Sequence, residues 1–273
     1  MRILLMTDLE GVSGVKNATD WLKPGDRYYE AGCRLLTQEV NAAVEGFFAG
    51  GAKYIQVADG HGAGAIDIEW LDERVEYARG WPGAWPFGLD SSFDGLAFVG
   101  QHAKASSELA HLAHTQSFHY IDLSVNGVSI GEFGQLSMCA SEVGVPAFFA
   151  SGDLALTAEA QALVPGITVC EVKRGVMRGT GEECTTQEYE ARNAGAVHIS
   201  PPRARQIIRQ SAEAAIRKLR KSPPPLVPMQ APFEAIALLR PDKHGEPKRI
   251  SRTHHATSFI ELMRQPLDLK PLG

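Results

Sequence analysis

Short apolar runs separated by helix-like segments constrain the fold of this chain more than any other feature of its sequence. The runs lie at residues 2–7, 54–58, 96–100, 147–150 and 167–172. Runs of this length without polar alternation are typical of strands buried on both faces of a parallel sheet. Between them, apolar residues at helical spacing predict a helix over residues 29–49, and Gly50-Gly51 marks its end. The same spacing predicts a second helix over about 154–163.

This alternation predicts an α/β fold: a Rossmann-like, mainly parallel sheet in a three-layer α/β/α arrangement. One segment breaks the rhythm, because Asn126-Gly127 lies between strand-like runs at 120–125 and 128–130. Asn-Gly in that position is a strong signal for an antiparallel hairpin. It indicates a second, smaller α+β domain.

We therefore expect a larger α/β domain over residues 1–180 and a smaller α+β domain over 181–273, to which the hairpin near 119–131 can also be assigned. In the second part, Ser200-Pro201-Pro202 predicts the start of a helix that ends near Lys221, with the serine as its cap. A strand is expected at 233–239 and a last helix at 258–263.

Composition excludes several classes of function. The chain has 273 residues and a formal net charge of −5, which disfavours nucleic acid as the main partner. The basic residues near 217–221 are better explained as complements to a helix dipole. The sequence contains no apolar stretch of about 20 residues, so no membrane span is predicted. The N-terminal apolar run is too short for a secretion signal. Four cysteines without a CxxC pair argue against a thiolate zinc site and for a reducing compartment, so a cytoplasmic location is expected.

Carboxylates and imidazoles follow the strand-like runs at the points where these end. Asp8 and Glu10 follow the first run, His61 the second and His102 the third, and Glu132 follows the hairpin. The carboxyl ends of parallel strands open on one edge of a sheet, so these side chains are expected to converge. Converging carboxylates repel each other unless a cation neutralises them.

The types of these side chains narrow the choice of cation. A set of oxygen and nitrogen ligands without thiolate suits zinc, manganese, cobalt or iron better than calcium or magnesium. Five ligands exceed the need of one four-coordinate zinc, which favours two metals that share a bridging carboxylate. The pattern therefore predicts a metal-dependent hydrolase.

Each of these residues also has an ordinary structural explanation. An acidic residue after a strand often caps a turn or helix, and this explanation is favoured for Asp153, which precedes a predicted helix. Asp59 is expected either to orient His61 as a metal ligand or to form a turn with its own backbone. A lone histidine is more often a hydrogen-bonded structural residue than a ligand. The shared position of the group at strand ends is what favours a site.

Several motifs resemble those of the zinc-dependent D-aminopeptidases, the group related to the D-aminopeptidase of bacterial dipeptide-transport operons. The motifs that carry the resemblance are Thr7-Asp8-Leu9-Glu10-Gly11-Val12-Ser13-Gly14, Asp59-Gly60-His61, Gly100-Gln101-His102-Ala103, Ala113-His114-Thr115 and Gly131-Glu132-Phe133-Gly134. The resemblance is faint beyond residue 175. The region 172–191, with Gly175, Gly179 and Gly181, is longer than the family pattern.

The resemblance implies a function and a set of site residues. It implies that two zinc ions per chain, with manganese or cobalt as alternatives, are bound by Asp8, Glu10, His61, His102 and Glu132. It also implies that His114 is a catalytic residue, either a nucleophile or a general acid–base, with His111 as a rival because the spacing is one residue longer than in the pattern. The implied substrates are short peptides with an N-terminal D-residue such as D-alanine, and the implied assembly is a homodecamer.

Two other functions remain open at the level of sequence. Gly60-His61-Gly62-Ala63-Gly64-Ala65 fits a G-x-G-x-x-A motif after a strand, which suggests a nucleotide-binding or transport-associated module without hydrolysis. A dimetal site also serves amidases and phosphoesterases.

Overall fold

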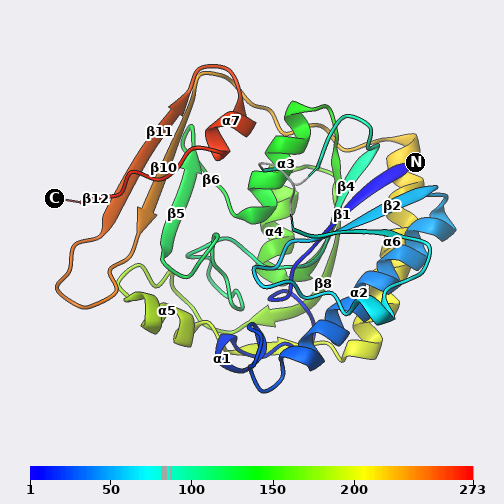
Figure 1. Ribbon diagram of the computed structural model, residues 1–273, viewed down its shortest axis with the longest axis horizontal. Coiled ribbons are helices and arrows are strands. Elements are labelled where there is room, and N and C mark those ends of the chain that lie inside the picture. Colours follow the sequence, from blue (N-terminus) through cyan, green and yellow to red (C-terminus); the bar gives the residue numbers. More distant parts are fainter. Residues whose placement is uncertain (81–84, 87, 273) are drawn as a thin grey trace.

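The computed structural model describes residues 1–80, 85–86 and 88–272. Within them the chain forms two sheets (Figure 1), a mainly parallel one of seven strands in the order β3-β2-β1-β4-β7-β8-β9 and an antiparallel one of five strands in the order β12-β11-β10-β5-β6. The strands of the first sheet are β1 (Arg2–Thr7), β2 (Tyr54–Asp59), β3 (Glu76–Ala78), β4 (Gly95–Gln101), β7 (Ala147–Asp153), β8 (Thr168–Gly175) and β9 (Ala196–His198). All neighbours in this sheet are parallel except β8 and β9. The predicted α/β class with a mainly parallel sheet is confirmed.

Helices cover both faces of the first sheet. The helical elements are α1 (Ala18–Trp21), α2 (Tyr29–Gly50), a 3-10 turn (Ile68–Trp70), α3 (Glu132–Glu142), α4 (Leu154–Leu163), α5 (Thr186–Arg192), α6 (Pro201–Lys221) and α7 (Phe259–Met263). Helix α2 ends at Gly51, which has a φ of 104°, a conformation that glycine adopts without strain. Ser200 is the N-cap residue of α6 and prolines fill the first turn, as predicted, but the Ser200 side chain makes no capping hydrogen bond.

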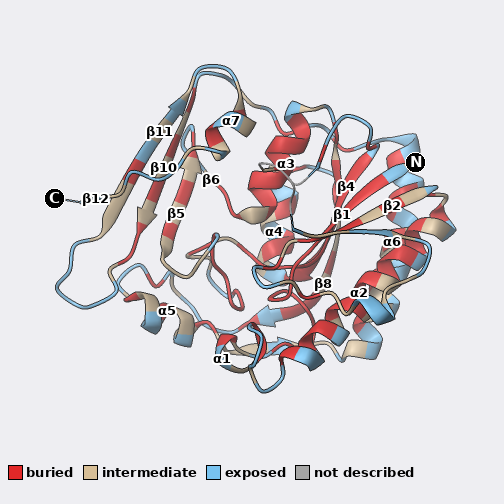
Figure 2. Cartoon of the chain, in the orientation of Figure 1, coloured by how far each residue is buried: buried red, intermediate tan, exposed pale blue. Residues whose placement is uncertain are grey.

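Alternation along β1 divides the core into two layers. Ile3 and Leu5 pack with the buried residues of α2 and α6 on one face of the sheet. Leu4 and Met6 point to the other face, where they join the cluster that contains residues of α3 and α4. Successive side chains of a strand point to opposite faces, which explains why this run is apolar throughout. Figure 2 shows the resulting buried centre of the sheet.

The second sheet packs on the layer that contains α3. It consists of β5 (Tyr120–Val125), β6 (Val128–Ser129), β10 (Phe233–Leu239), β11 (Arg249–His255) and β12 (Lys270–Pro271). Strand β10 alternates buried and half-buried residues, as expected for a sheet with one face on a core, and its buried side chains share a cluster with those of α3 and α7. Asn126 and Gly127 both have positive φ, and Val125 pairs with Val128, so the predicted hairpin is confirmed.

The predicted division into domains stays a prediction, but two placements bear on it. The β5–β6 hairpin pairs with β10 in the antiparallel sheet, although it lies before residue 180. Helix α6 lies after residue 180, yet its buried residues pack with α2 on the first sheet. The two sheets therefore exchange segments along the chain.

No described helix combines the length and the apolar character needed to cross a lipid bilayer. The four cysteines are free, and three of them are buried, whereas Cys184 is half-buried.

Candidate metal centre

Three adjacent strands deliver the first part of the site. Strands β2, β1 and β4 are parallel neighbours, and each is followed within three residues by a candidate ligand. Asp8 and Glu10 follow β1, His61 follows β2 and His102 follows β4. All four side chains are at least nine-tenths buried. The edge of an open parallel sheet beyond the carboxyl ends of its strands is the usual place for a ligand site, and it is occupied here as predicted.

Two glycines allow the chain to turn tightly at this edge. The Gly11 N–H donates to Gly100 O at 2.7 Å, so the segment after β1 crosses directly over the end of β4. A Cβ atom on Gly11 would lie 2.0 Å from Gln101 O, and one on Gly100 would lie 2.0 Å from Asp8 O. Gly100 also has a φ of 75°. Both positions therefore require glycine, because a side chain would force the two ligand-bearing segments apart.

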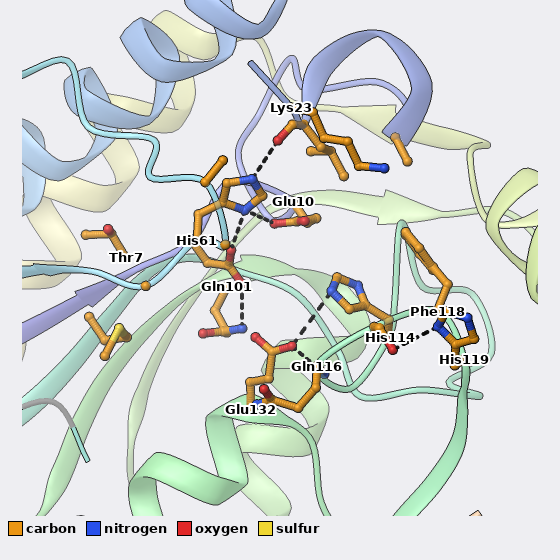
Figure 3. Close-up of a pocket in the computed structure, with 18 of the residues that line it drawn as sticks. Thr7, Glu10, Lys23, His61, Gln101, His114, Gln116, Phe118, His119 and Glu132 are labelled. Carbon is orange, nitrogen blue, oxygen red and sulfur yellow. Dashed lines mark hydrogen bonds and ion pairs between the residues drawn. The ribbon is translucent and has the colours of Figure 1, made fainter. Parts of the chain in front are cut away.

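The Asp8 carboxylate lies between two groups of ligand atoms. Asp8 Oδ1 is 3.3 Å from His61 Nδ1, and Asp8 Oδ2 is 3.2 Å from His102 Nε2. Glu10 Oε2 lies 3.1 Å from His61 Nδ1 on the first side. On the second side Glu132 Oε2, from the first residue of α3, lies 3.6 Å from His102 Nε2. The structure thus brings all five predicted ligands together around the Asp8 carboxylate. Figure 3 shows three of them, Glu10, His61 and Glu132.

His114 joins the second group from the long connection between β4 and β5. Its Nε2 lies 3.7 Å from Glu132 Oε1, and its ring stacks on that of His102 with centroids 4.0 Å apart. His111 lies elsewhere: its Nε2 donates to Lys16 O at 3.0 Å, and its backbone N–H donates to Asp153. A cavity opens beside the ligand groups, with Asp8, Glu10, His61 and Glu132 in its wall. His114 also lines this cavity, whereas His111 is not among the described residues of its lining.

Main-chain carbonyls fix the orientation of all three imidazoles. A carbonyl only accepts hydrogen bonds, so the ring nitrogen that contacts it must carry a proton and the other nitrogen is left for the site. The contacts are His61 Nε2 to Leu22 O at 2.8 Å, His102 Nδ1 to Ala103 O at 2.9 Å, and His114 Nδ1 to Leu112 O at 2.8 Å. In each ring the remaining nitrogen faces a carboxylate, and His102 Nε2, which is buried, lies beside the carboxylates of both Asp8 and Glu132. A buried imidazole nitrogen that faces two carboxylates fits a metal ligand.

The charges of the site depend on each other. Burial alone would raise the pKa of Asp8, but hydrogen bonds with His102 and His61 hold it well below its usual value. Burial would lower the pKa of His61, yet the charge of Glu10 and the hydrogen bond with Asp8 raise it to about 12. In the same way, against the effect of burial, Glu132 and Asp8 raise the pKa of His102. The carboxylates thus require positive charge beside them, which imidazolium protons or a divalent cation can supply, and the cation would displace the protons.

Sequence reasoning missed three residues that support the site. Gln101 donates to Asp8 Oδ2 at 3.0 Å, and the Gln116 N–H donates to Glu132 Oε1 at 2.7 Å. Lys173 on β8 is fully buried, and its Nζ donates to Glu10 O and, at 3.0 Å, to Val12 O. Gln101 lies inside a motif that the sequence singled out. Lys173 follows an apolar run and gave no signal beyond that of a residue at the end of a strand.

Two other acidic residues have structural roles. Asp59 accepts hydrogen bonds from Ala65 N at 3.0 Å and from Tyr77 Oη at 2.9 Å. These partners lie six or more residues away, so Asp59 does not form the predicted turn with its own backbone but holds the loop after β2. The carbonyl of Leu22, not Asp59, orients His61. Asp153 accepts from Leu156 N at 2.9 Å and caps α4, as predicted. The glycine-rich segment after β2 opens onto the 3-10 turn rather than a long helix, so it lacks the helix N-terminus that a nucleotide motif uses to bind a pyrophosphate.

An open α/β sheet with acid and imidazole side chains gathered at its carboxyl edge defines the class of α/β hydrolytic enzymes with a candidate metal centre. Comparison with known proteins is more specific. The profile of peptidase family M55, described as D-aminopeptidase, matches residues 1–244. The chain therefore belongs to the D-aminopeptidase family of peptidases, which confirms the resemblance seen in the sequence.

Two known proteins illustrate this relationship. The chain is 27% identical over 239 residues to a D-aminopeptidase of Bacillus subtilis (strain 168), in a match that covers 86% of this chain and 81% of the relative. The fold is similar to the solved structure of the Zn-dependent D-aminopeptidase DppA from Bacillus subtilis, described as a self-compartmentalizing protease. That match has a TM-score of 0.81 at 22% identity and covers 96% of this chain and 94% of the other.

Proposed function

We propose that this protein is a di-zinc aminopeptidase that removes N-terminal D-residues, D-alanine in particular, from short peptides. The observation that carries the proposal is the position of Asp8, whose two carboxylate oxygens each face an imidazole of a different ligand group. A carboxylate in this position can be shared by two cations, as in many dimetal peptidases. Membership of the D-aminopeptidase family supports the reaction.

The proposed ligands form two sets around Asp8. Glu10 and His61 complete the first set, and His102 and Glu132 complete the second. Oxygen and imidazole donors without thiolate fit zinc, with manganese and cobalt as alternatives. Bound cations would act as Lewis acids on the scissile carbonyl and neutralise the charge that develops there.

The chain's own groups have separate proposed roles. The free N-terminal amine of the substrate would dock on a metal or on a carboxylate such as Glu10, which would confine cleavage to the amino end. The His114 Nδ1–H is held by Leu112 O, so Nε2 is the atom that faces the cavity. That nitrogen either attacks the carbonyl or takes a proton from the nucleophile and passes it to the leaving amine.

The proposal also covers assembly and location. The solved relative is described as self-compartmentalizing. We extend this to a closed homo-oligomer of the present chain, a decamer, that acts on peptides in the cytoplasm.

Metal analysis and a substrate panel test the function. Protein as purified should hold about two zinc-class ions per chain, and exhaustive chelation should abolish hydrolysis of D-Ala-D-Ala. The panel adds L-Ala-L-Ala and nitrophenyl phosphate, so that an L-specific peptidase or a phosphoesterase is recognised. Full activity after chelation would contradict the metal site, and turnover of the phosphate ester alone would contradict the peptidase.

A further inference from the structure

A lysine, Lys23, lines the cavity that contains the candidate metal centre. The cavity has a volume of about 440 Å³. Its acidic lining residues are Asp8, Glu10, Glu132 and Glu190. Lys23 is the single lysine or arginine in the described lining, and it makes no ion pair or side-chain hydrogen bond within the described part of the chain. His119, also in the lining, already faces Asp242 at 3.3 Å.

The backbone of Lys23 is fixed relative to the metal centre. The residue before it, Leu22, is buried and accepts through its carbonyl the hydrogen bond from His61 Nε2. The N–H groups of Leu22 and Lys23 both donate to Asp26 Oδ2, at 3.1 and 2.8 Å. In Figure 3 Lys23 lies beyond His61 and Glu10, at the end of the cavity opposite Glu132. The same contacts that orient His61 therefore bring an unpaired ammonium to the wall of the cavity.

A short peptide carries two charged ends, an N-terminal ammonium and a C-terminal carboxylate. Its N-terminal amine can dock at the metal centre, where the bound cations would offset the charges of Asp8, Glu10 and Glu132. Its C-terminal carboxylate needs a separate positively charged partner. Lys23 is exposed, and it is the single lysine or arginine of the described lining that the carboxylate can meet. Its ammonium lies on a flexible stem and has three N–H donors. One extended residue spans about 3.3–3.6 Å, and the cavity is near the lower end of the roughly 300–1,000 Å³ of ligand sites, so it suits a substrate of few residues.

We infer that Lys23 binds the free C-terminal carboxylate of the substrate and thereby selects di- and tripeptides over longer or C-terminally blocked peptides. The inference rests on the proposed peptidase function and specifies its substrate class. It makes Lys23 a specificity residue that contacts the substrate away from the bond that is broken.

The test compares D-Ala-D-Ala with D-Ala-D-alaninamide, in which a neutral amide replaces the carboxylate. The wild-type, zinc-loaded protein should show a lower KM for the free acid. Lys23→Met should raise the KM for the free acid roughly tenfold, as expected for loss of one charge-assisted hydrogen bond. The KM for the amide and the kcat for both substrates should stay unchanged, and Lys23→Arg should retain the preference.

Lys53→Met is the matched control, because Lys53 is an exposed lysine outside the cavity lining, and it should leave both KM values unchanged. Equal KM values of the wild type for acid and amide, or an undiminished preference in Lys23→Met, would overturn the carboxylate site while leaving the peptidase intact. Absence of hydrolysis of both substrates by the wild type would overturn the peptidase proposal, and the inference would fall with it.

Discussion

The two ligand groups that meet at Asp8 are built in different ways. In the first group, Asp8, Glu10 and His61 directly follow adjacent parallel strands, and the crossing of Gly11 over Gly100 holds them at the sheet edge. In the second group only His102 follows a strand, because Glu132 begins α3 and His114 lies on the connection between β4 and β5. Regular hydrogen bonding thus positions one side of the site, and tertiary contacts position the other.

The connection that carries His114 has an unusual backbone. Within it, four non-glycine residues have positive φ values between 54° and 62°: Ser106, Leu109, Leu112 and Gln116. Such conformations cost free energy and persist where surrounding contacts impose them, often at functional sites. Contacts from the segment around α5 supply the support: Leu109 N donates to Met177 O, Leu112 N to Asn193 O, and Ser106 N to the buried Tyr189 Oη.

This difference teaches that the region 172–191 has a structural role. It supports the connection that carries His114, and it contributes Thr186 and Glu190 to the wall of the cavity. The strand-end group, in contrast, depends on β8 through the Lys173 ammonium. Three predictions separate these two halves of the site.

The largest effect is expected on the side of the long connection. His114→Gln should lower kcat for D-Ala-D-Ala by about 10²–10⁴-fold, because it removes the group that attacks or moves the proton. Metal content, measured by elemental analysis, should remain that of the wild type. His111→Gln is the matched control and should keep its activity, because His111 lies outside the cavity lining. Loss of activity in His111→Gln alone would assign the catalytic role to that residue instead.

A smaller effect is expected on the strand-end side. Lys173→Met leaves Glu10 O and Val12 O without their buried donor, so the segment that carries Asp8 and Glu10 is released. Zinc affinity should fall roughly 10–100-fold, as for other residues that orient ligands, and competition with a chromophoric chelator measures it. Lys218→Met is the control, because Lys218 also donates to a carbonyl, that of Gly166 on the surface. A variant with reduced stability but unchanged zinc affinity would show that Lys173 supports the fold only.

The smallest effect is a change in the pH dependence of stability. Burial, with a further contribution from Lys173, lowers the pKa of His111 from its ordinary 6.5 to about 2. The unfolded chain therefore binds one more proton than the folded chain between these values, and the folded state loses stability as the pH falls below 6.5. The contribution amounts to at most about 1.4 kcal/mol per pH unit. In chelated protein, His111→Gln should show a shallower loss of unfolding free energy between pH 6.5 and 4.5 than the wild type.

Denaturant titrations at several pH values measure this slope. The difference between wild type and variant should be confined to pH values below 6.5. Parallel pH profiles for the two proteins would show that His111 titrates alike in the folded and unfolded states.

The strand-end half of the site was predictable because its signals are local. Apolar runs that end in Asp8, His61 and His102 specify both the parallel sheet and the edge on which the side chains meet. Asn126-Gly127 likewise encodes its hairpin within four residues. These features depend on periodicity and turn chemistry, which a single sequence displays.

The parts of the fold and of the site that the sequence did not predict depend on contacts between segments far apart in the chain. Residues 102–119 have no period that would predict four left-handed residues, because the acceptors that bind their N–H groups lie at residues 132, 177, 189 and 193. Helix α3 was not predicted, so Glu132 was expected at the end of a hairpin rather than in the first turn of a helix. The burial of Lys173 follows from its position beneath a segment that lies more than 160 residues earlier in the chain.

The carbonyls of Leu22, Ala103 and Leu112 each bind one ring nitrogen, so the main chain sets the orientation of the three imidazoles. We therefore expect a protein stripped of its ions to be reloaded without refolding. One divalent ion could then be exchanged for another by dialysis of the folded protein. The spectrum of a coloured or paramagnetic ion would then show the ligand environment of each half of the centre.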